Sequence, residues 1–180
     1  MIDEKRKKEA KANFDRYLRE NMLKKERNET ALFTYIKNAE LSLDVAEKLM
    51  KDLELKPYLW VVVCSYYSMF YTANAVLLKL GYKTGEENVH KVTSDALVVL
   101  VLDKLKKGMI EDYESAMEDA LEIANARSSE IIENYEREKI KRGRFQYNMD
   151  EQIKEQKAKT SLQRAKEFVF EIKKLMDRIK

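Results

Sequence analysis

The sequence predicts an all-α fold, an up-and-down bundle of about five helices with an N-terminal helical extension. Apolar residues make up 44% of the 180 residues, which suffices for one core of packed helices. Four glycines and one proline leave little material for the turns of a sheet. Apolar residues recur at helical spacing along most of the chain, so helices account for the whole domain.

The first segment, residues 3–25, reads as a charged helix with few apolar positions. Because its apolar stripe is weak, we expect it to pack loosely or against a second subunit. Residues 1–28 therefore form the extension, and residues 29–180 form the bundle.

The second helix is expected to be capped by Asn28 or Thr30, whose side chains suit a helix N-terminus. A seam at three-four spacing follows it, made of Ile36, Ala39, Leu43, Ala46, Met50 and Leu53. This seam predicts a helix that packs antiparallel to the next one.

The third helix, residues 57–80, is the centre of the fold, because no charged residue lies between Lys56 and Lys79. Pro57 suits a first helical position, and Gly81 can adopt the left-handed conformation that ends a helix. Such a stretch is also long enough to span a membrane. Four polar residues within it favour a core helix, namely Ser65, Ser68, Thr72 and Asn74.

The remaining helices are predicted from their boundaries. Thr84 and Glu87 have the form of a capping box for a helix over residues 85–106, which Gly108 would end. An acidic helix to about residue 140 and a final helix from about residue 150 complete the bundle.

A family resemblance lies in the third helix and the turn after it. The residues that carry it are Tyr66-Tyr67-Ser68-Met69-Phe70-Tyr71-Thr72-Ala73, then Val76-Leu77-Leu78-Lys79-Leu80-Gly81, and His90. This pattern resembles the second helix of HEPN domains, and more narrowly that of small stand-alone archaeal and bacterial members, over residues 32–92. The resemblance implies a homodimer that often works beside a minimal nucleotidyltransferase in toxin-antitoxin pairs or RNA-related defence.

Many HEPN domains are metal-independent ribonucleases whose active site is an arginine, four to six residues, and a histidine. An arginine can hold the scissile phosphate, and a histidine can move the proton of a 2′-hydroxyl near neutral pH. The only histidine of this chain, His90, lies upstream of every candidate arginine. The standard motif is therefore absent.

The nearest match to that motif is Arg142 followed by Tyr147. Because an ordinary tyrosine has a pKa of about 10, Tyr147 would be a poor general base at neutral pH, so we expect this segment to bind RNA rather than cut it. Arg142 and Arg144 would contact phosphates, while Phe145 and Tyr147 offer stacking faces for bases. A solvated basic loop is the alternative interpretation.

His90 and four aromatic residues of the third helix are the other candidates. His90 either helps to line a central groove or holds its loop by a hydrogen bond; we favour the second role, because no acid or cysteine is spaced to orient it for catalysis. Tyr66, Tyr67, Phe70 and Tyr71 are too many for one side of a helix, so some must face a groove or a second subunit.

Metals, cofactors and export are not predicted. The acidic residues between 111 and 122 lack the Glu-x-x-His pairs of di-iron bundles, and the single cysteine, Cys64, lies in the most apolar helix. The first 20 residues are alternately charged and resemble neither a signal peptide nor an anchor. We therefore expect a cytoplasmic protein without cofactor.

Three functional hypotheses remain. The favoured one is a HEPN-type homodimer that binds RNA or a protein partner. The second is a divergent metal-independent endoribonuclease that uses Arg142, with Tyr147 or His90. The third is a structural bundle whose N-terminal helix recruits another protein, in which case deleting residues 1–27 should leave the bundle folded.

Overall fold

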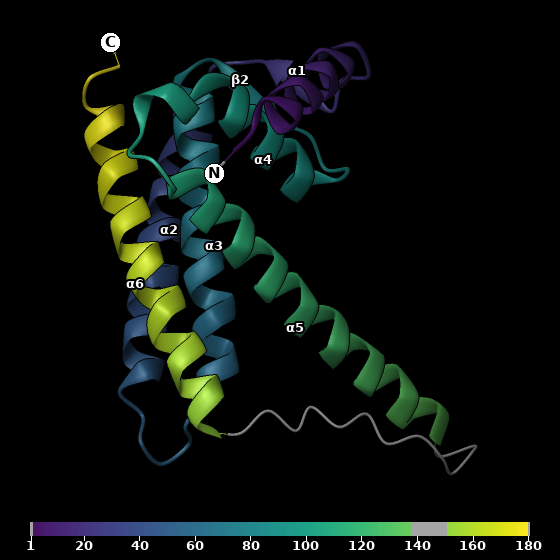
Figure 1. Cartoon of the computed structure of the whole chain (residues 1–180), viewed down its shortest axis with the longest axis vertical. Helices are drawn as coiled ribbons and strands as arrows, with labels where there is room; N and C mark the ends of the chain where they lie inside the picture. Colours follow the sequence, from purple (N-terminus) through teal and green to yellow (C-terminus); the bar gives the residue numbers. More distant parts are fainter. Residues whose placement is uncertain (1, 138–150, 180) are drawn as a thin grey trace.

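The computed structural model describes residues 2–137 and 151–179. Three long helices run side by side along the molecule, α2 (Glu29–Met50), α3 (Tyr58–Lys79) and α6 (Glu151–Met176) (Figure 1). α2 and α3 are antiparallel, because only a short loop joins them. The described residues thus confirm the all-α bundle.

The other elements gather at one end of these three helices. There α1 (Glu4–Arg19) and α4 (Val89–Leu100) lie beside a small sheet of β1 (Leu23–Lys25) and β2 (Tyr82–Thr84) (Figure 1). The two strands are antiparallel, with Leu23 opposite Thr84. A 3₁₀ turn, Leu102–Lys104, follows α4.

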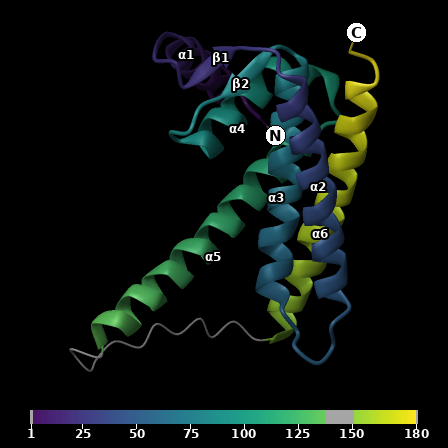
Figure 2. The ribbon, with the colours of Figure 1, turned by 180° about the vertical axis from the view of Figure 1, so that it is seen from behind.

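Helix α5 (Met109–Arg137) starts against this end and then leaves the bundle at an angle (Figures 1 and 2). It begins directly after Gly108, whose φ of +93° is accessible to glycine at little cost. Because α5 diverges, it does not cover the full length of α3.

Helix α3 is the core helix that its composition predicted. Its boundaries lie within one residue of the expected ones, with Pro57 at the N-cap and Gly81, at φ +87°, after the C-cap. Among the described helices, α3 alone is long and apolar enough to cross a membrane, yet 78% of that apolar window is buried inside the protein. Burial on this scale is that of a core helix.

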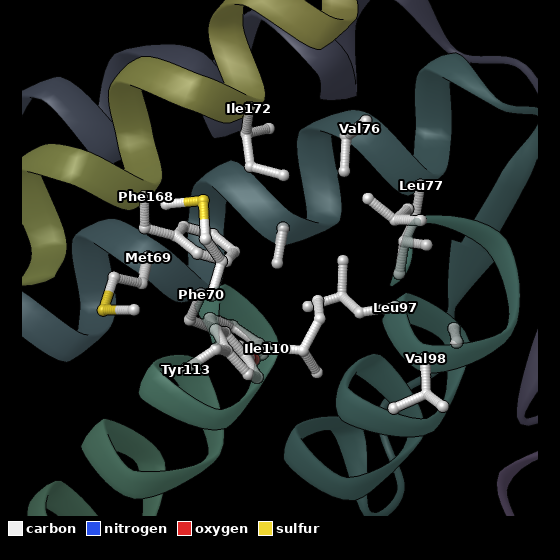
Figure 3. Packing of buried hydrophobic residues seen from close by; sticks show 14 of the residues in the cluster. Met69, Phe70, Val76, Leu77, Leu97, Val98, Ile110, Tyr113, Phe168 and Ile172 are labelled. Carbon is white, nitrogen blue, oxygen red and sulfur yellow. The ribbon is translucent and has the colours of Figure 1, made fainter. Parts of the chain in front are cut away.

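The main core lies where α3, α4, α5 and α6 converge (Figure 3). Met69 of α3, Leu97 of α4, Tyr113 of α5 and Phe168 of α6 are all inaccessible to solvent. The rings of Tyr113 and Phe168 stack with centroids 5.4 Å apart. The first turns of α5 are therefore fixed to the bundle by buried side chains.

The N-terminal helix is tightly packed, and the expectation of loose packing is wrong. Ala10, Phe14 and Tyr17 are buried against the main core, at the four-three spacing of one helix face. The helix is also shorter than predicted, because residues 23–25 pair with β2. Three buried apolar residues, with the partly buried Leu18 packed beside them, thus dock a helix whose other positions are mostly charged.

The predicted capping box of Thr84 and Glu87 is also wrong. Thr84 lies in β2, and its buried hydroxyl donates to Oδ1 of Asn74 at 2.7 Å. Helix α4 begins later, after Asn88, which has φ +47° and makes no side-chain cap bond. A tertiary partner for the threonine hydroxyl has replaced the local one. By contrast, Asn28 caps α2 as expected, since its Oδ1 accepts from the amide of Ala31 at 2.9 Å.

Candidate functional site

His90 lies in a cluster of aromatic side chains between α3 and α4. Its Nδ1 is 2.6 Å from the hydroxyl of Tyr66, and its ring centroid lies 4.7 Å from that of Phe70 and 6.3 Å from that of Tyr67. Tyr113 of α5 completes the group, with its ring 5.9 Å from that of Tyr66. We call these five residues the His90 cluster.

The surroundings of the cluster fix its protonation. Burial raises the pKa of Tyr66 and of Tyr113 well above the usual range of a phenol. Burial also lowers the pKa of His90, so the imidazole is neutral at pH 7. The neutral Tyr66 hydroxyl and the neutral imidazole therefore share one hydrogen bond at Nδ1, in which the tautomer of His90 decides which group is the donor.

This arrangement suits a structural hydrogen bond better than a general base. One of the two ring nitrogens, Nδ1, is bonded to Tyr66, and no carboxylate or arginine contacts His90 among the described residues. Through this hydrogen bond His90, in α4, is joined to Tyr66 in α3.

The four aromatic candidates of α3 divide between interior and surface. Tyr66 and Phe70 are buried within the chain's own core. Tyr67 is 36% exposed, and the half-buried Tyr71 stacks on Tyr35 of α2. The surface pair, not the buried pair, is therefore available to a ligand or a second subunit.

A stripe along α3 contains this surface pair. It comprises five apolar or aromatic positions at helical spacing that are exposed or half-buried: Trp60, Val63, Cys64, Tyr67 and Tyr71. Trp60 is 57% exposed, an unusual state for a tryptophan. No charged residue interrupts the stripe, and Figure 2 shows α3 in the angle between α2 and the diverging α5. We call it the open α3 face.

Trp60 was not singled out from the sequence. Its signal was available, because Trp60, Cys64, Tyr67 and Tyr71 repeat at four, three and four residues. Because this helix is apolar all round, the sequence alone could not distinguish an exposed stripe at that spacing from the stripe that faces the core.

A second polar group, also missed from the sequence, attaches α1 to α4 and α5. Asp95 is fully buried and contacts Nη1 of Arg6 at 2.6 Å, the hydroxyl of Tyr17 at 3.0 Å and the side-chain amide of Asn13 at 3.0 Å. Arg6 also reaches Oε1 of Glu114 at 2.6 Å. We call these five residues the Asp95 clamp. Since its charges are paired internally, the clamp is a structural element.

The predicted RNA-binding segment lies outside the described residues. Its four candidate residues are Arg142, Arg144, Phe145 and Tyr147. α5 ends before them at Arg137, and α6 begins after them.

The described residues offer no metal site, and their pocket at the start of α2 lies away from the predicted site residues. Within residues 2–137 and 151–179, no three His, Cys, Asp or Glu side chains are grouped to hold a metal ion. A shallow pocket at the start of α2 contains none of the predicted site residues and is lined by Arg27, Asn28, Glu29, Leu32, Leu78 and Lys79.

Comparison with known proteins gives one match. The family model described as HEPN domain matches residues 32–175, from the first turn of α2 to the last turn of α6. No curated protein and no solved structure matches the chain.

Proposed function

The chain belongs to the HEPN family, and from this premise we propose that it is a homodimeric module that binds RNA without cutting it. The observation that carries the second part is the state of the only histidine. His90 is half-buried, bonded to Tyr66 through Nδ1 and located on α4, where no arginine contacts it among the described residues. A HEPN-type nuclease needs its histidine free to exchange a proton beside an arginine.

The open α3 face supports the homodimer. A soluble protein rarely leaves a tryptophan and two tyrosines on an uncharged stripe without a partner. A second copy of the chain would present the same uncharged stripe, so the two apolar surfaces could pack against each other. Buried tyrosines at such an interface keep their hydroxyls paired at its edge.

The RNA contact that we propose combines phosphate binding and base stacking. Arg142 and Arg144 supply charge, and Phe145 and Tyr147 supply rings, within the segment 142–147. The match to the HEPN family provides the reason to expect RNA rather than another polyanion.

One gel experiment tests this function. Purified protein and its Arg142→Ala variant are incubated with labelled single-stranded RNA in EDTA, and mobility shift and cleavage are read together. We expect the wild type to shift intact RNA and the variant to shift it about tenfold less well, as for the loss of a charged contact of 1–2 kcal/mol.

Two outcomes would contradict the proposal. Cleavage by the wild type that disappears in Arg142→Ala would identify a metal-independent endoribonuclease. Failure of the wild type to shift RNA at low salt, where phosphate contacts are strongest, would exclude an RNA-binding module.

A further inference from the structure

Helix α1 has two faces of different character. Its buried residues, Ala10, Phe14 and Tyr17, define the inner face. The opposite face follows the spacing three, four, four and three and consists of Lys5, Lys8, Ala12, Arg16 and Arg19. All five side chains are exposed. The outer face of α1 is therefore basic.

The acidic residues of α1 do not neutralise this face, because they have other partners. Glu4 pairs with Lys7 at 2.8 Å, Glu9 with Lys91 at 3.4 Å, and Asp15 with Lys11 at 3.2 Å. Glu20, just past the helix end, lies 4.0 Å from Arg16.

Three cations of the outer face remain. Within the described part of the chain, Lys5, Lys8 and Arg19 form no ion pair. At 1.5 Å per residue, they extend over about 21 Å.

Three further exposed cations lie on β1 and in the turn after it. Lys24, Lys25 and Arg27 are exposed, whereas the acid between them, Glu26, is bonded to Lys83 at 2.7 Å. α1 and β1 lie together at the same end of the molecule (Figures 1 and 2). Six cations that form no ion pair among the described residues thus lie on α1, on β1 and in the turn after β1.

The Asp95 clamp holds this surface rigidly. Arg6 faces inward, where it contacts Asp95 and Glu114, so the orientation of α1 about its own axis is fixed by buried charges. Cations that are already oriented lose less entropy when they contact a ligand than cations on a free helix would.

We propose that the outer face of α1, continued by β1, is a second contact surface for the phosphate backbone of the bound RNA. This inference rests on the proposed RNA-binding function. The exposed side chains of this face are lysines, arginines and an alanine. With no ring to stack on a base, the surface contacts phosphates without reading sequence.

Salt dependence tests this surface. The binding of a labelled single-stranded 20-mer of uridine is measured at several salt concentrations for the full chain and for the triple variant Lys5→Gln, Lys8→Gln, Arg19→Gln. Each lost phosphate contact reduces the slope of log K against log salt by about 0.7 for a single strand. We therefore expect the slope to fall by about 2, and binding at 0.1 M salt to weaken by about a hundredfold.

The matched control is Lys37→Gln, Lys48→Gln, Lys107→Gln. It removes the same charge from three lysines that are exposed but lie outside α1 and β1, and circular dichroism verifies that both variants are folded. A control that keeps the wild-type slope supports the surface.

Three outcomes would overturn the inference. An α1 variant with the wild-type slope would refute this surface while leaving the proposed function intact. An equal loss in both variants would show a general effect of net charge. A wild type that fails to bind the 20-mer would refute the proposed function and this surface together.

Discussion

At the scale of single residues, the decisive feature is the pairing of His90 with Tyr66. A histidine in a protein of the HEPN family suggests a catalytic role, but this imidazole shares a hydrogen bond with a buried phenol. Both groups are neutral at pH 7, because burial disfavours their charged forms. The pair therefore stabilises the junction of α3 and α4.

This pairing predicts a pH dependence of stability. Since burial lowers the pKa of His90 in the folded state, the unfolded chain binds the extra proton first as the pH falls. The stabilisation is complete above the unfolded pKa of about 6.5 and is lost as the pH falls through the folded pKa. The free energy of unfolding, measured with urea, should therefore decrease between about pH 7 and pH 5, and less so in His90→Gln.

Because His90 is the only histidine, its ring resonances report the titration without ambiguity. A pKa at or above about 6.5 in the folded protein would contradict this account. So would identical pH profiles for the wild type and His90→Gln.

At the scale of elements, α1 is an integral part of the domain. Its inner face buries three apolar residues, and Arg6 pairs with the carboxylate of Asp95, which has no access to solvent. Deleting residues 1–27, as the recruitment hypothesis requires, would leave Asp95 without three of its partners. That deletion would leave the buried carboxylate of Asp95 uncompensated and would destabilise α4. It therefore cannot separate recruitment from folding.

A double-mutant cycle tests the clamp. Asp95→Ala should lower the free energy of unfolding by about 3–5 kcal/mol, because it leaves the guanidinium of Arg6 facing the interior without one of its two carboxylate partners. The combination of Arg6→Ala and Asp95→Ala should be less harmful than the sum of the single changes, with a coupling energy of about 0.5–3 kcal/mol.

Lys91→Ala serves as the control for this cycle. Lys91 also contacts Asp95, at 3.2 Å, but 46% of its side chain is exposed, so its removal should cost less than about 1 kcal/mol. Additive effects of the Arg6 and Asp95 substitutions would show that the pair does not hold α1.

The elements differ in how far the sequence could predict them. α3 was placed within one residue, because Pro57 and Gly81 act locally at its ends, and Asn28 was identified as a cap for the same reason. The hydroxyl of Thr84 instead bonds to Asn74 of α3, 10 residues away in the sequence. The carboxylate of Asp95 bonds to Asn13, 82 residues away. Such pairings depend on tertiary structure and leave no periodic signal.

At the scale of the whole molecule, the divergence of α5 determines which surface is free. The first turns of α5 are anchored by Tyr113, Ile123 is still buried in a cluster with Val61 and Val62 of α3, and beyond it the helix moves away from α3 (Figures 1 and 2). The sequence predicted helices of the correct number and type but not this angle, because a charged helix carries no signal of where it leaves a bundle. The open α3 face results from that angle.

Native mass spectrometry can show whether a homodimer binds RNA and leaves it intact. The protein, with a mass of 21.3 kDa per chain, is mixed in EDTA with one single-stranded RNA of defined length. We expect a mass of two chains with intact RNA, and only single chains for Trp60→Glu. Phe170→Glu, which alters an equally exposed aromatic residue (60%) on α6, should remain dimeric. A single chain as the wild-type species, or masses of shortened RNA, would contradict the account.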